Sequence, residues 1–183
     1  MPPHAPPNEP CIHICTYGEF YGPPPRLPFP QDTPPFTIPC IHLPAPSKPL
    51  CDHYTGLDRP LSSAFFSNPA NEAYFRQQRA ALAAYIVHPA IASQGRCVVV
   101  WVSCRAGMHR RVAVAERFAR ELRRGRWGVE CRHLDLERSV ARREERLVRE
   151  RDLSLGYPLV GERAMGGGGW GGWGGGYGFN GYY

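Results

Sequence analysis

The segment SCRAGMHRR, residues 103–111, places a thiol, a glycine, a histidine and three arginines directly after the apolar run CVVVWV. The apolar run predicts a strand over 97–102, and the spacing of apolar residues after it predicts a helix that begins near Arg110. In open parallel sheets, ligands bind where strands end and helices begin. The free N–H groups and positive dipole end of this helix are expected to face the segment. It is therefore the first candidate for a binding site.

The side chains of this segment favour an anionic ligand, most simply a phosphate. Its arginines supply positive charge, His109 supplies a donor that titrates near neutral pH, and Gly107 lets the backbone approach a ligand closely. The alternative is a packed turn whose arginines face solvent. The residues of this segment predicted to bind phosphate are Cys104, Arg105, Gly107, His109, Arg110 and Arg111.

The same segment matches a catalytic pattern, because Cys104 and Arg110 have the C-x5-R spacing of cysteine-dependent phosphatases. In that chemistry the arginine clamps the phosphoryl group and a thiolate attacks phosphorus. Ser103 replaces the histidine usual in tyrosine phosphatases, and Arg111 replaces the hydroxyl residue that usually follows the arginine. The general acid would have to be Asp58. We therefore assign no catalytic residue and keep the phosphatase as the alternative to a binding module.

Two further stretches, residues 11–17 and 36–43, are β-prone, and Pro39 favours an edge position for the second. Residues 127–133 alternate weakly between apolar and polar and are expected to return to the sheet. A strand, a helix and a strand in this order form a crossover between parallel strands. The last stretch is therefore expected to pair in parallel with 97–102.

These elements, with a helix expected to start at Asn68, predict an α/β fold. We predict a single three-layer-type domain at 11–137 with a small, mostly parallel sheet. The proline-rich residues 1–10 are expected to be disordered, and residues 138–164 to form a charged helical extension. Residues 165–183 hold eleven glycines among aromatic residues. Such a low-complexity tail cannot build a packed core, so it is also expected to be disordered.

Basic side chains are concentrated in the second half of the chain: residues 96–183 carry 17 of the 22, and every one except Lys48 is an arginine. The planar fork of arginine suits phosphate, which favours an anionic partner. On the helix expected after residue 133, four arginines fall near one stripe and form a candidate RNA-binding surface. Acidic residues on the same helix support the alternative of a solvated face. The four are Arg138, Arg142, Arg146 and Arg149.

Four of the seven cysteines begin a C-x-H pair, at Cys11, Cys40, Cys51 and Cys131. Residues two apart on a strand share a face, so each pair has the spacing to bind zinc. The pairs are scattered and no C-x-x-C knuckle occurs, which favours buried strand cysteines over a metal site. We predict no metal, no cofactor and reduced thiols, as is usual inside cells.

The sequence has no apolar run of the roughly 18 residues that a membrane span needs, and no apolar segment behind a basic start that would indicate a secretory signal. A cytoplasmic protein without a membrane partner is the expectation. No pattern in the sequence indicates an oligomeric state.

Four motifs between residues 11 and 137 occur in the order known from one protein family. The four motifs are TYGEFYG at 16–22, LP at 43–44 with TGLDRP at 55–60, SCRAGMHRRV at 103–112 and RHLDL at 132–136. They resemble S-F-G-F-K-H-G, F-L-P-N-P with T-G-L-D-K-P, G-C-T-G-G-x-H-R-S-V and R-H-R-D-L of the C-terminal domain of RapZ, the bacterial RNase adapter family.

The resemblance implies a phosphate-binding α/β module that senses an amino-sugar phosphate and contributes to RNA binding. The expected partner is a phosphorylated small molecule of the sugar-phosphate or nucleotide class. Tyr21 stands where members have a ligand-contacting histidine, and Asp58 is expected in or near the pocket. Because Arg111 replaces a serine, the pocket is expected to be tighter and more cationic. No G-x-x-x-x-G-K-[ST] motif occurs, so the nucleotide hydrolysis of the family's P-loop half is not implied.

Overall fold

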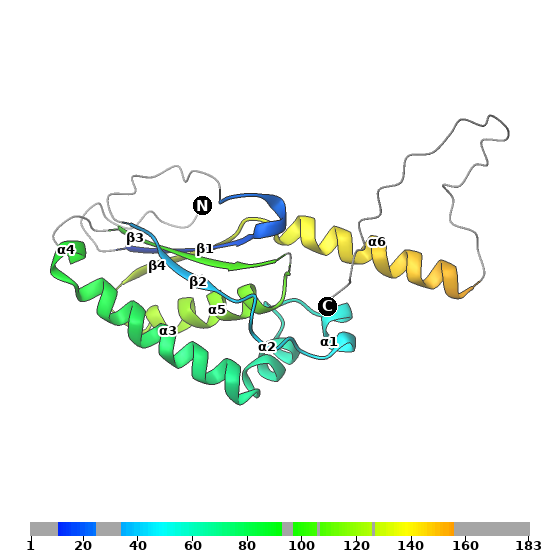
Figure 1. The fold of residues 1–183 in the computed structure, drawn as a ribbon, viewed down its shortest axis with the longest axis horizontal. Coiled ribbons are helices and arrows are strands. Elements are labelled where there is room, and N and C mark those ends of the chain that lie inside the picture. The colour runs from blue at the N-terminus through cyan, green and yellow to red at the C-terminus, as the bar shows by residue number, and fades with distance from the viewer. Residues whose placement is uncertain (1–10, 25–33, 93–96, 106, 126, 156–183) are drawn as a thin grey trace, which may run out of the picture. The chain divides into compact units, whose positions relative to one another are not determined.

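The protein is built on a four-stranded parallel sheet with the strand order β2-β3-β1-β4 (Figure 1). The computed structural model describes residues 11–24, 34–92, 97–105, 107–125 and 127–155. The strands are β1 (Cys11–Gly18), β2 (Phe36–Pro39), β3 (Cys97–Cys104) and β4 (Gly128–His133). The α/β class and the parallel sheet predicted from the sequence are confirmed.

The central positions of β1 and β3 follow from their composition. Both are rich in β-branched residues, and seven of the eight residues of β3 are buried. The short β2 lies at the edge of the sheet, as Pro39 predicted, because proline lacks the N–H that an inner strand must donate.

The crossover from β3 through α5 (Arg110–Leu122) to β4 is parallel as expected, but the predicted pairing is wrong. Strand β1 lies between β3 and β4 and pairs with both, Cys11 facing Cys97 on one side and Gly128 on the other. A crossover fixes the relative direction of two strands, whereas their adjacency depends on whether a third strand enters between them.

The other helices of the described part of the chain lie between the strands in sequence, except α6 (Leu136–Ser154), which follows β4. Asn68 caps α3 (Pro69–Val87) by accepting a hydrogen bond from the N–H of Ala70, 2.9 Å away. The bounds are η1 (Glu19–Tyr21), α1 (Lys48–His53), α2 (Arg59–Phe66), α3 (Pro69–Val87), α4 (Pro89–Ala92) and α6 (Leu136–Ser154).

The main core lies between the sheet and the helices α2, α3 and α5, which Figure 1 shows on one face of the sheet. Even-numbered residues of β1 and β3, such as Ile14 and Val100, meet Phe75 and Phe118 there. Odd-numbered residues point to the opposite face, where Cys15, Val99 and Trp101 form a smaller buried cluster. The two faces therefore carry different side chains of the same strands.

The chain divides at residue 147 into two compact units, and the sheet belongs to the first. The predicted disordered segments, residues 1–10 and 165–183, lie outside the described residues, as does the end of the predicted extension 138–164. Among the helices described, none has the length and apolar character to cross a membrane.

The prediction of seven reduced thiols is wrong at two positions. Cys11 and Cys97 are joined by a disulfide, because the parallel register places them directly opposite each other with a Cα–Cα distance of 4.7 Å. The prediction of buried strand cysteines in the C-x-H pairs holds only in part, because Cys40 is a buried free thiol just after β2, whereas Cys51 and Cys131 are half-buried.

Candidate functional site

The sheet has its topological switch point between β1 and β3, because the chain leaves β1 toward β2 on one side and leaves β3 toward β4 on the other. Ligands of open α/β sheets bind at the carboxyl ends of the strands at such a point. Gly18 and Cys104, the last residues of the two strands, are paired there. Cys104 belongs to the segment SCRAGMHRR, whose other residues after Ser103 follow it directly.

Arg111 is the most unusual side chain at this point. Its side chain is 0% exposed, and none of its guanidinium nitrogens has a hydrogen-bond partner among the residues described. The nearest opposite charge is the Asp135 carboxylate, 3.7 Å from one terminal nitrogen. Burial lowers the pKa of Arg111, while Cys104 and Asp135 act in the opposite direction. An arginine nevertheless keeps its proton in proteins, so a positive charge is buried here.

Gly18 makes room for this guanidinium. A Cβ atom at Gly18 would lie 2.8 Å from a terminal nitrogen of Arg111 and 2.8 Å from the ring of Tyr21. The N–H of Gly18 donates to Asp135 across 2.9 Å, which holds the carboxylate beside the arginine. Residues Tyr21 and Asp135 also line a cleft of about 310 Å³. The buried charge therefore lies against the wall of a cleft.

His109 and Arg110 point to other parts of the protein. Arg110 donates from one terminal nitrogen to the carbonyls of Ile41 and Leu43, each 2.7 Å away. His109 donates from Nε2 to the carbonyl of Cys51 across 3.0 Å. Burial, with a further contribution from nearby arginines, lowers the pKa of His109. Its imidazole is therefore neutral at pH 7, and both side chains fasten the segment to the residues after β2.

The thiol of Cys104 is buried, and it donates to the carbonyl of Gly107, with 3.3 Å between sulfur and oxygen. Arg105 has an exposed side chain, and its carbonyl accepts a 2.7 Å hydrogen bond from the N–H of Phe20. In the C-x5-R chemistry, the arginine has to face the same phosphoryl group as the thiolate. Arg110 instead binds two backbone carbonyls.

Asp58 shapes a turn beside the segment. Its carboxylate accepts hydrogen bonds from the N–H and the hydroxyl of Thr55, at 2.7 and 2.9 Å. Within this turn Gly56 donates to the carbonyl of Met108, and a Cβ there would lie 2.3 Å from the carbonyl oxygen of His109. Only glycine allows this approach, so the TGLD turn is packed against the first turn of α5.

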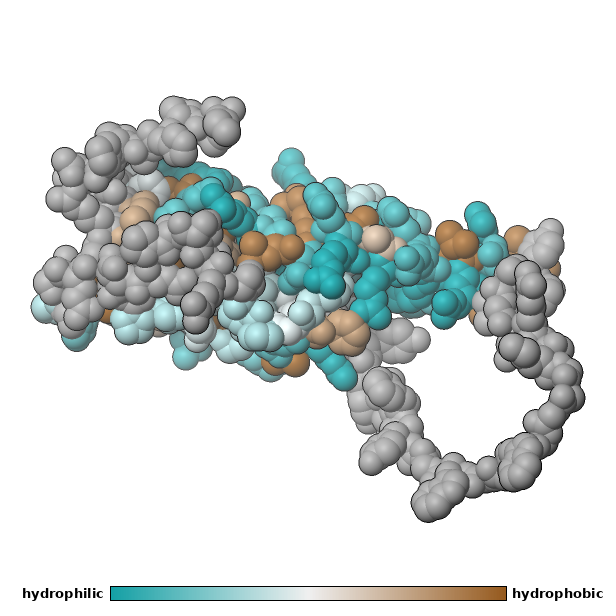
Figure 2. All heavy atoms as spheres, turned by 90° about the horizontal axis from the view of Figure 1, so that it is seen from above, coloured by the Kyte–Doolittle hydropathy of each residue, from teal (hydrophilic) through white to brown (hydrophobic). Residues whose placement is uncertain are grey.

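The arginines predicted to bind RNA are partly engaged within the protein. The guanidinium of Arg138 stacks 4.7 Å from the ring centre of Tyr21, and that of Arg142 stacks 4.5 Å from that of Phe20. Arg146 forms an ion pair with Asp52. In Figure 2, hydrophilic side chains predominate where α6 lies. The arginines along the first turns of this helix thus contact rings and a carboxylate of the same chain.

Two groups of residues at or near the site were not predicted from the sequence. Gly18 and Asp135 belong to the family motifs but were not predicted as site residues, although Gly18 leaves room for Arg111 and Asp135 is its nearest opposite charge. A groove of about 830 Å³ between α2 and α5 is rich in arginine. Its signal is the spacing of arginines along 117–124, which repeats at three and four residues. The groove arginines are Arg59, Arg117, Arg120, Arg123 and Arg124.

Comparisons with known proteins agree with this arrangement: the family model of the RapZ C-terminal domain matches residues 11–137. The chain belongs to the RapZ C-terminal domain family. Relatives of this RapZ-type domain include a nucleotide-binding protein of Thermus thermophilus, 36% identical over 128 residues that cover 69% of this chain and 43% of the relative. Nucleotide-binding proteins of a Synechococcus strain and of Lactiplantibacillus plantarum are 31% and 28% identical, over 66% and 69% of this chain and 34% and 40% of theirs. The match thus spans less than half of each relative.

Proposed function

We propose that this domain binds a phosphorylated small molecule at the carboxyl ends of β1 and β3, with a nucleotide as the first class to test. The observation behind this proposal is Arg111, a fully buried cation whose donors have no hydrogen-bond partner among the described residues. The names of the relatives, all nucleotide-binding proteins, favour the nucleotide class.

The energetic argument starts from the cost of a buried charge. A buried donor left without a partner costs about 1–3 kcal/mol, and more when it is charged. Asp135 offsets only part of this cost at 3.7 Å, and its oxygen also accepts from Gly18. A phosphate has enough oxygens to accept from several guanidinium donors at once. An anion that binds here therefore offsets part of the desolvation cost of the buried guanidinium. An arginine on the surface has no such cost, so an anion gains less free energy by binding to it.

The other predicted residues have supporting parts in this proposal. Tyr21 forms a wall of the cleft next to Arg111. His109 and Arg110 fasten the segment from the opposite side, and Gly107 with Cys104 closes its turn. The positive end of the α5 dipole adds to the attraction for an anion. In this proposal the site binds a phosphorylated ligand without turning it over. A cysteine-dependent phosphatase stays the alternative.

The test is a thermal-shift panel on the full chain with inorganic phosphate, sugar phosphates and nucleotides. A ligand at 100 times its Kd stabilises the native state by about 2.7 kcal/mol, which raises the midpoint. We expect the best probe to raise the midpoint of the parent and of the control Arg76→Met, whose arginine is exposed. In Arg111→Met the shift is expected to vanish.

Two results would contradict this proposal. One is an equal shift in Arg111→Met and in the parent, which would remove the buried arginine from the site. The other is release of phosphate from an aryl phosphate that disappears in Cys104→Ser, which would establish the phosphatase. Circular dichroism of Arg111→Met verifies that a lost shift does not reflect a lost fold.

RNA binding by Arg138, Arg142, Arg146 and Arg149 stays a prediction and is not part of the proposal. The first three would have to give up ring or carboxylate contacts to reach an RNA phosphate. Salt-dependent binding that survives in the full chain at physiological ionic strength would be needed to add it.

A further inference from the structure

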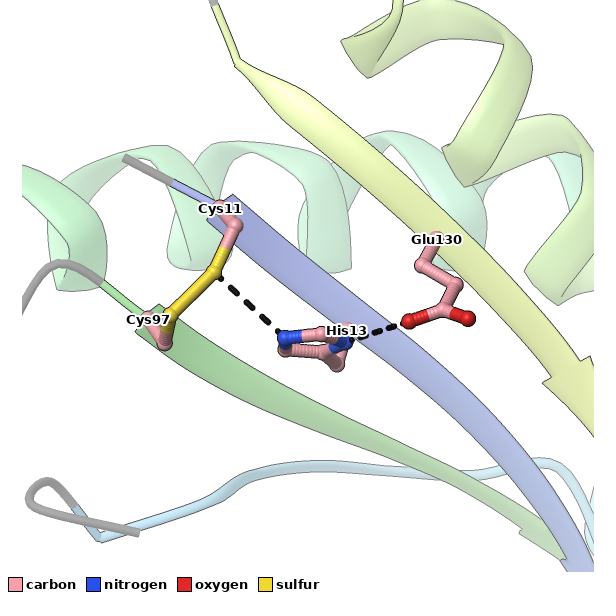
Figure 3. The surroundings of a disulfide bond; sticks show 4 residues. All are labelled: Cys11, His13, Cys97 and Glu130. Carbon is pink, nitrogen blue, oxygen red and sulfur yellow. Dashed lines mark hydrogen bonds and ion pairs between the residues drawn. A yellow bond between two sulfur atoms is a disulfide. The ribbon is translucent and has the colours of Figure 1, made fainter. Parts of the chain in front are cut away.

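A group of metal-ligating side chains lies at the amino ends of β1 and β3, on the face of the sheet opposite α5. Cys11 and Cys97 are directly opposite each other and form the disulfide, and His13 lies two residues along the same face of β1 (Figure 3). The ligand atoms of the three residues lie within 4.8 Å of one another. This group stands at the other end of the strands from the proposed phosphate site.

The other C-x-H pairs of the sequence do not gather ligands in this way. The thiol of Cys40 donates to the carbonyl of Ile38, and the thiol of Cys51 donates to that of Pro46. Within the described residues, only Cys131 with His133 joins a second group, in which Glu116 is the third member. The spacing of a C-x-H pair is therefore not enough to form a metal site. A third ligand has to come from a neighbouring strand or helix.

The hydrogen bonds of the two histidines distinguish these two groups. His133 donates from Nε2 to Glu116 across 3.0 Å, and its Nδ1 accepts from the hydroxyl of Thr16 across 3.1 Å. Both nitrogens of that ring are thus used by protein partners. His13 faces Glu130 with Nδ1, at 3.0 Å, and Cys11 with Nε2, at 3.4 Å. Its Nε2 points at the sulfur, where a metal ligand is needed.

We propose that the thiol form of this group binds one Zn²⁺ through the Sγ atoms of Cys11 and Cys97 and the Nε2 atom of His13, with water in the fourth position. Zn–S bonds of about 2.3 Å and Zn–N bonds of about 2.0–2.1 Å place ligand atoms of a tetrahedron about 3.5 Å apart. The observed sulfur–nitrogen distance of 3.4 Å matches that edge. Two thiolates and an imidazole are also the ligands that favour zinc over magnesium or calcium.

Glu130 supplies the support that metal-binding histidines usually have. Its carboxylate accepts from Nδ1 of His13, which fixes the tautomer and orients the ring with Nε2 toward Cys11 (Figure 3). The other oxygen of Glu130 lies 2.6 Å from a terminal nitrogen of Arg132, which holds the carboxylate in place. The imidazole is therefore oriented before any metal arrives.

The zinc-bound and disulfide forms exclude each other. Reduction of the Cys11–Cys97 bond by a phosphine gives two thiols: the phosphine supplies two electrons, and water supplies the two protons and the oxygen of the phosphine oxide. Zn²⁺ binding to these thiols releases two protons, because the ligands are thiolates. The same two sulfurs are thus either bonded to each other or to the metal, and the reaction does not involve the proposed phosphate site.

The test uses the full chain, reduced with a phosphine under inert gas and titrated with Co²⁺ as the visible substitute for Zn²⁺. We expect thiolate-to-cobalt charge-transfer absorption that saturates at one Co²⁺ per chain and disappears when Zn²⁺ is added. The band is expected to be absent in Cys97→Ser and in the oxidised parent. It is expected to persist in Cys131→Ser, the matched control from the second group.

A second variant keeps the test independent of folding. Glu130→Gln, a change at a half-exposed side chain, is expected to keep the band and to weaken Co²⁺ binding by about 10–100-fold. The proposal would be overturned by a band that persists in Cys97→Ser, by loss of the band in Cys131→Ser, or by a reduced parent without a band. Unchanged Co²⁺ affinity in Glu130→Gln would remove Glu130 from the site.

Discussion

The two ends of the central strands carry opposite kinds of chemistry. At the carboxyl ends, Gly18 leaves space for the buried guanidinium of Arg111, and an excess of positive charge favours an anion. At the amino ends, Cys11 and Cys97 with His13 offer soft electron-pair donors, which favour a metal cation or a bond between the sulfurs. One pair of strands can thus present two unrelated sites, because the two groups of side chains lie at opposite ends and on opposite faces of it.

The largest effect is expected from breaking the covalent link at the amino ends. A phosphine reductant with a chelator should lower the free energy of unfolding of the parent by about 2–4 kcal/mol, because the disulfide closes a long loop, with a sequence separation of 86 between its cysteines. Denaturant unfolding measures this difference, and Cys97→Ser should show no response to the reductant. A phosphate-induced thermal shift that also disappears on reduction would show that the two ends are coupled.

A smaller effect is expected at the carboxyl ends from Arg110→Ala. The variant loses hydrogen bonds from a charged group to the carbonyls of Ile41 and Leu43, so its free energy of unfolding should fall by about 2 kcal/mol. Chemical denaturation measures the loss, with the exposed Arg105→Ala as a control expected to change by less than about 0.5 kcal/mol. The ligand-induced shift should remain. Its loss in Arg110→Ala would move the phosphate contact from Arg111 to its neighbour.

The smallest effect is a dependence on pH through His109. Because burial lowers its pKa in the folded protein, the unfolded chain takes up the proton first as the pH falls below about 6.5. Stability should therefore decrease between pH 7 and pH 5, by at most about 1.4 kcal/mol per pH unit for this group. The His109→Gln variant, whose amide can still donate to the Cys51 carbonyl, should lose stability less steeply. Equal slopes of parent and variant would contradict a buried neutral imidazole.

The strands and the start of α5 could be predicted because their signals are local. The run CVVVWV, the β-prone CIHICTY and the Asn68 cap each specify an element without help from distant residues. The insertion of β1 between β3 and β4 has no such signal, since it depends on contacts across more than 80 residues. The short helices α1 and α2 were missed, although Pro60 and the Asp58 turn mark the start of the latter.

The segment that forms the site was predicted from the sequence, but the directions in which its side chains point were not. Helical spacing turns neighbouring residues by about 100°, so Arg110 and Arg111 had to point to different places. Which of them would be buried depends on Gly18 and Asp135, which come from other parts of the chain. The C-x-H spacing of Cys11 and His13 could likewise be read from the sequence. That Cys97 lies beside this pair follows only from the parallel register of β1 and β3.

The position of β1 has a consequence for the order in which the protein assembles. The central strand is formed by residues 11–18, while its two partners begin at Cys97 and Gly128. During synthesis, both edges of β1 lack their partners until most of the domain has been made, and sheets with such distant pairings fold slowly. The disulfide between Cys11 and Cys97 can therefore form only after β3, which begins at Cys97, has been synthesised.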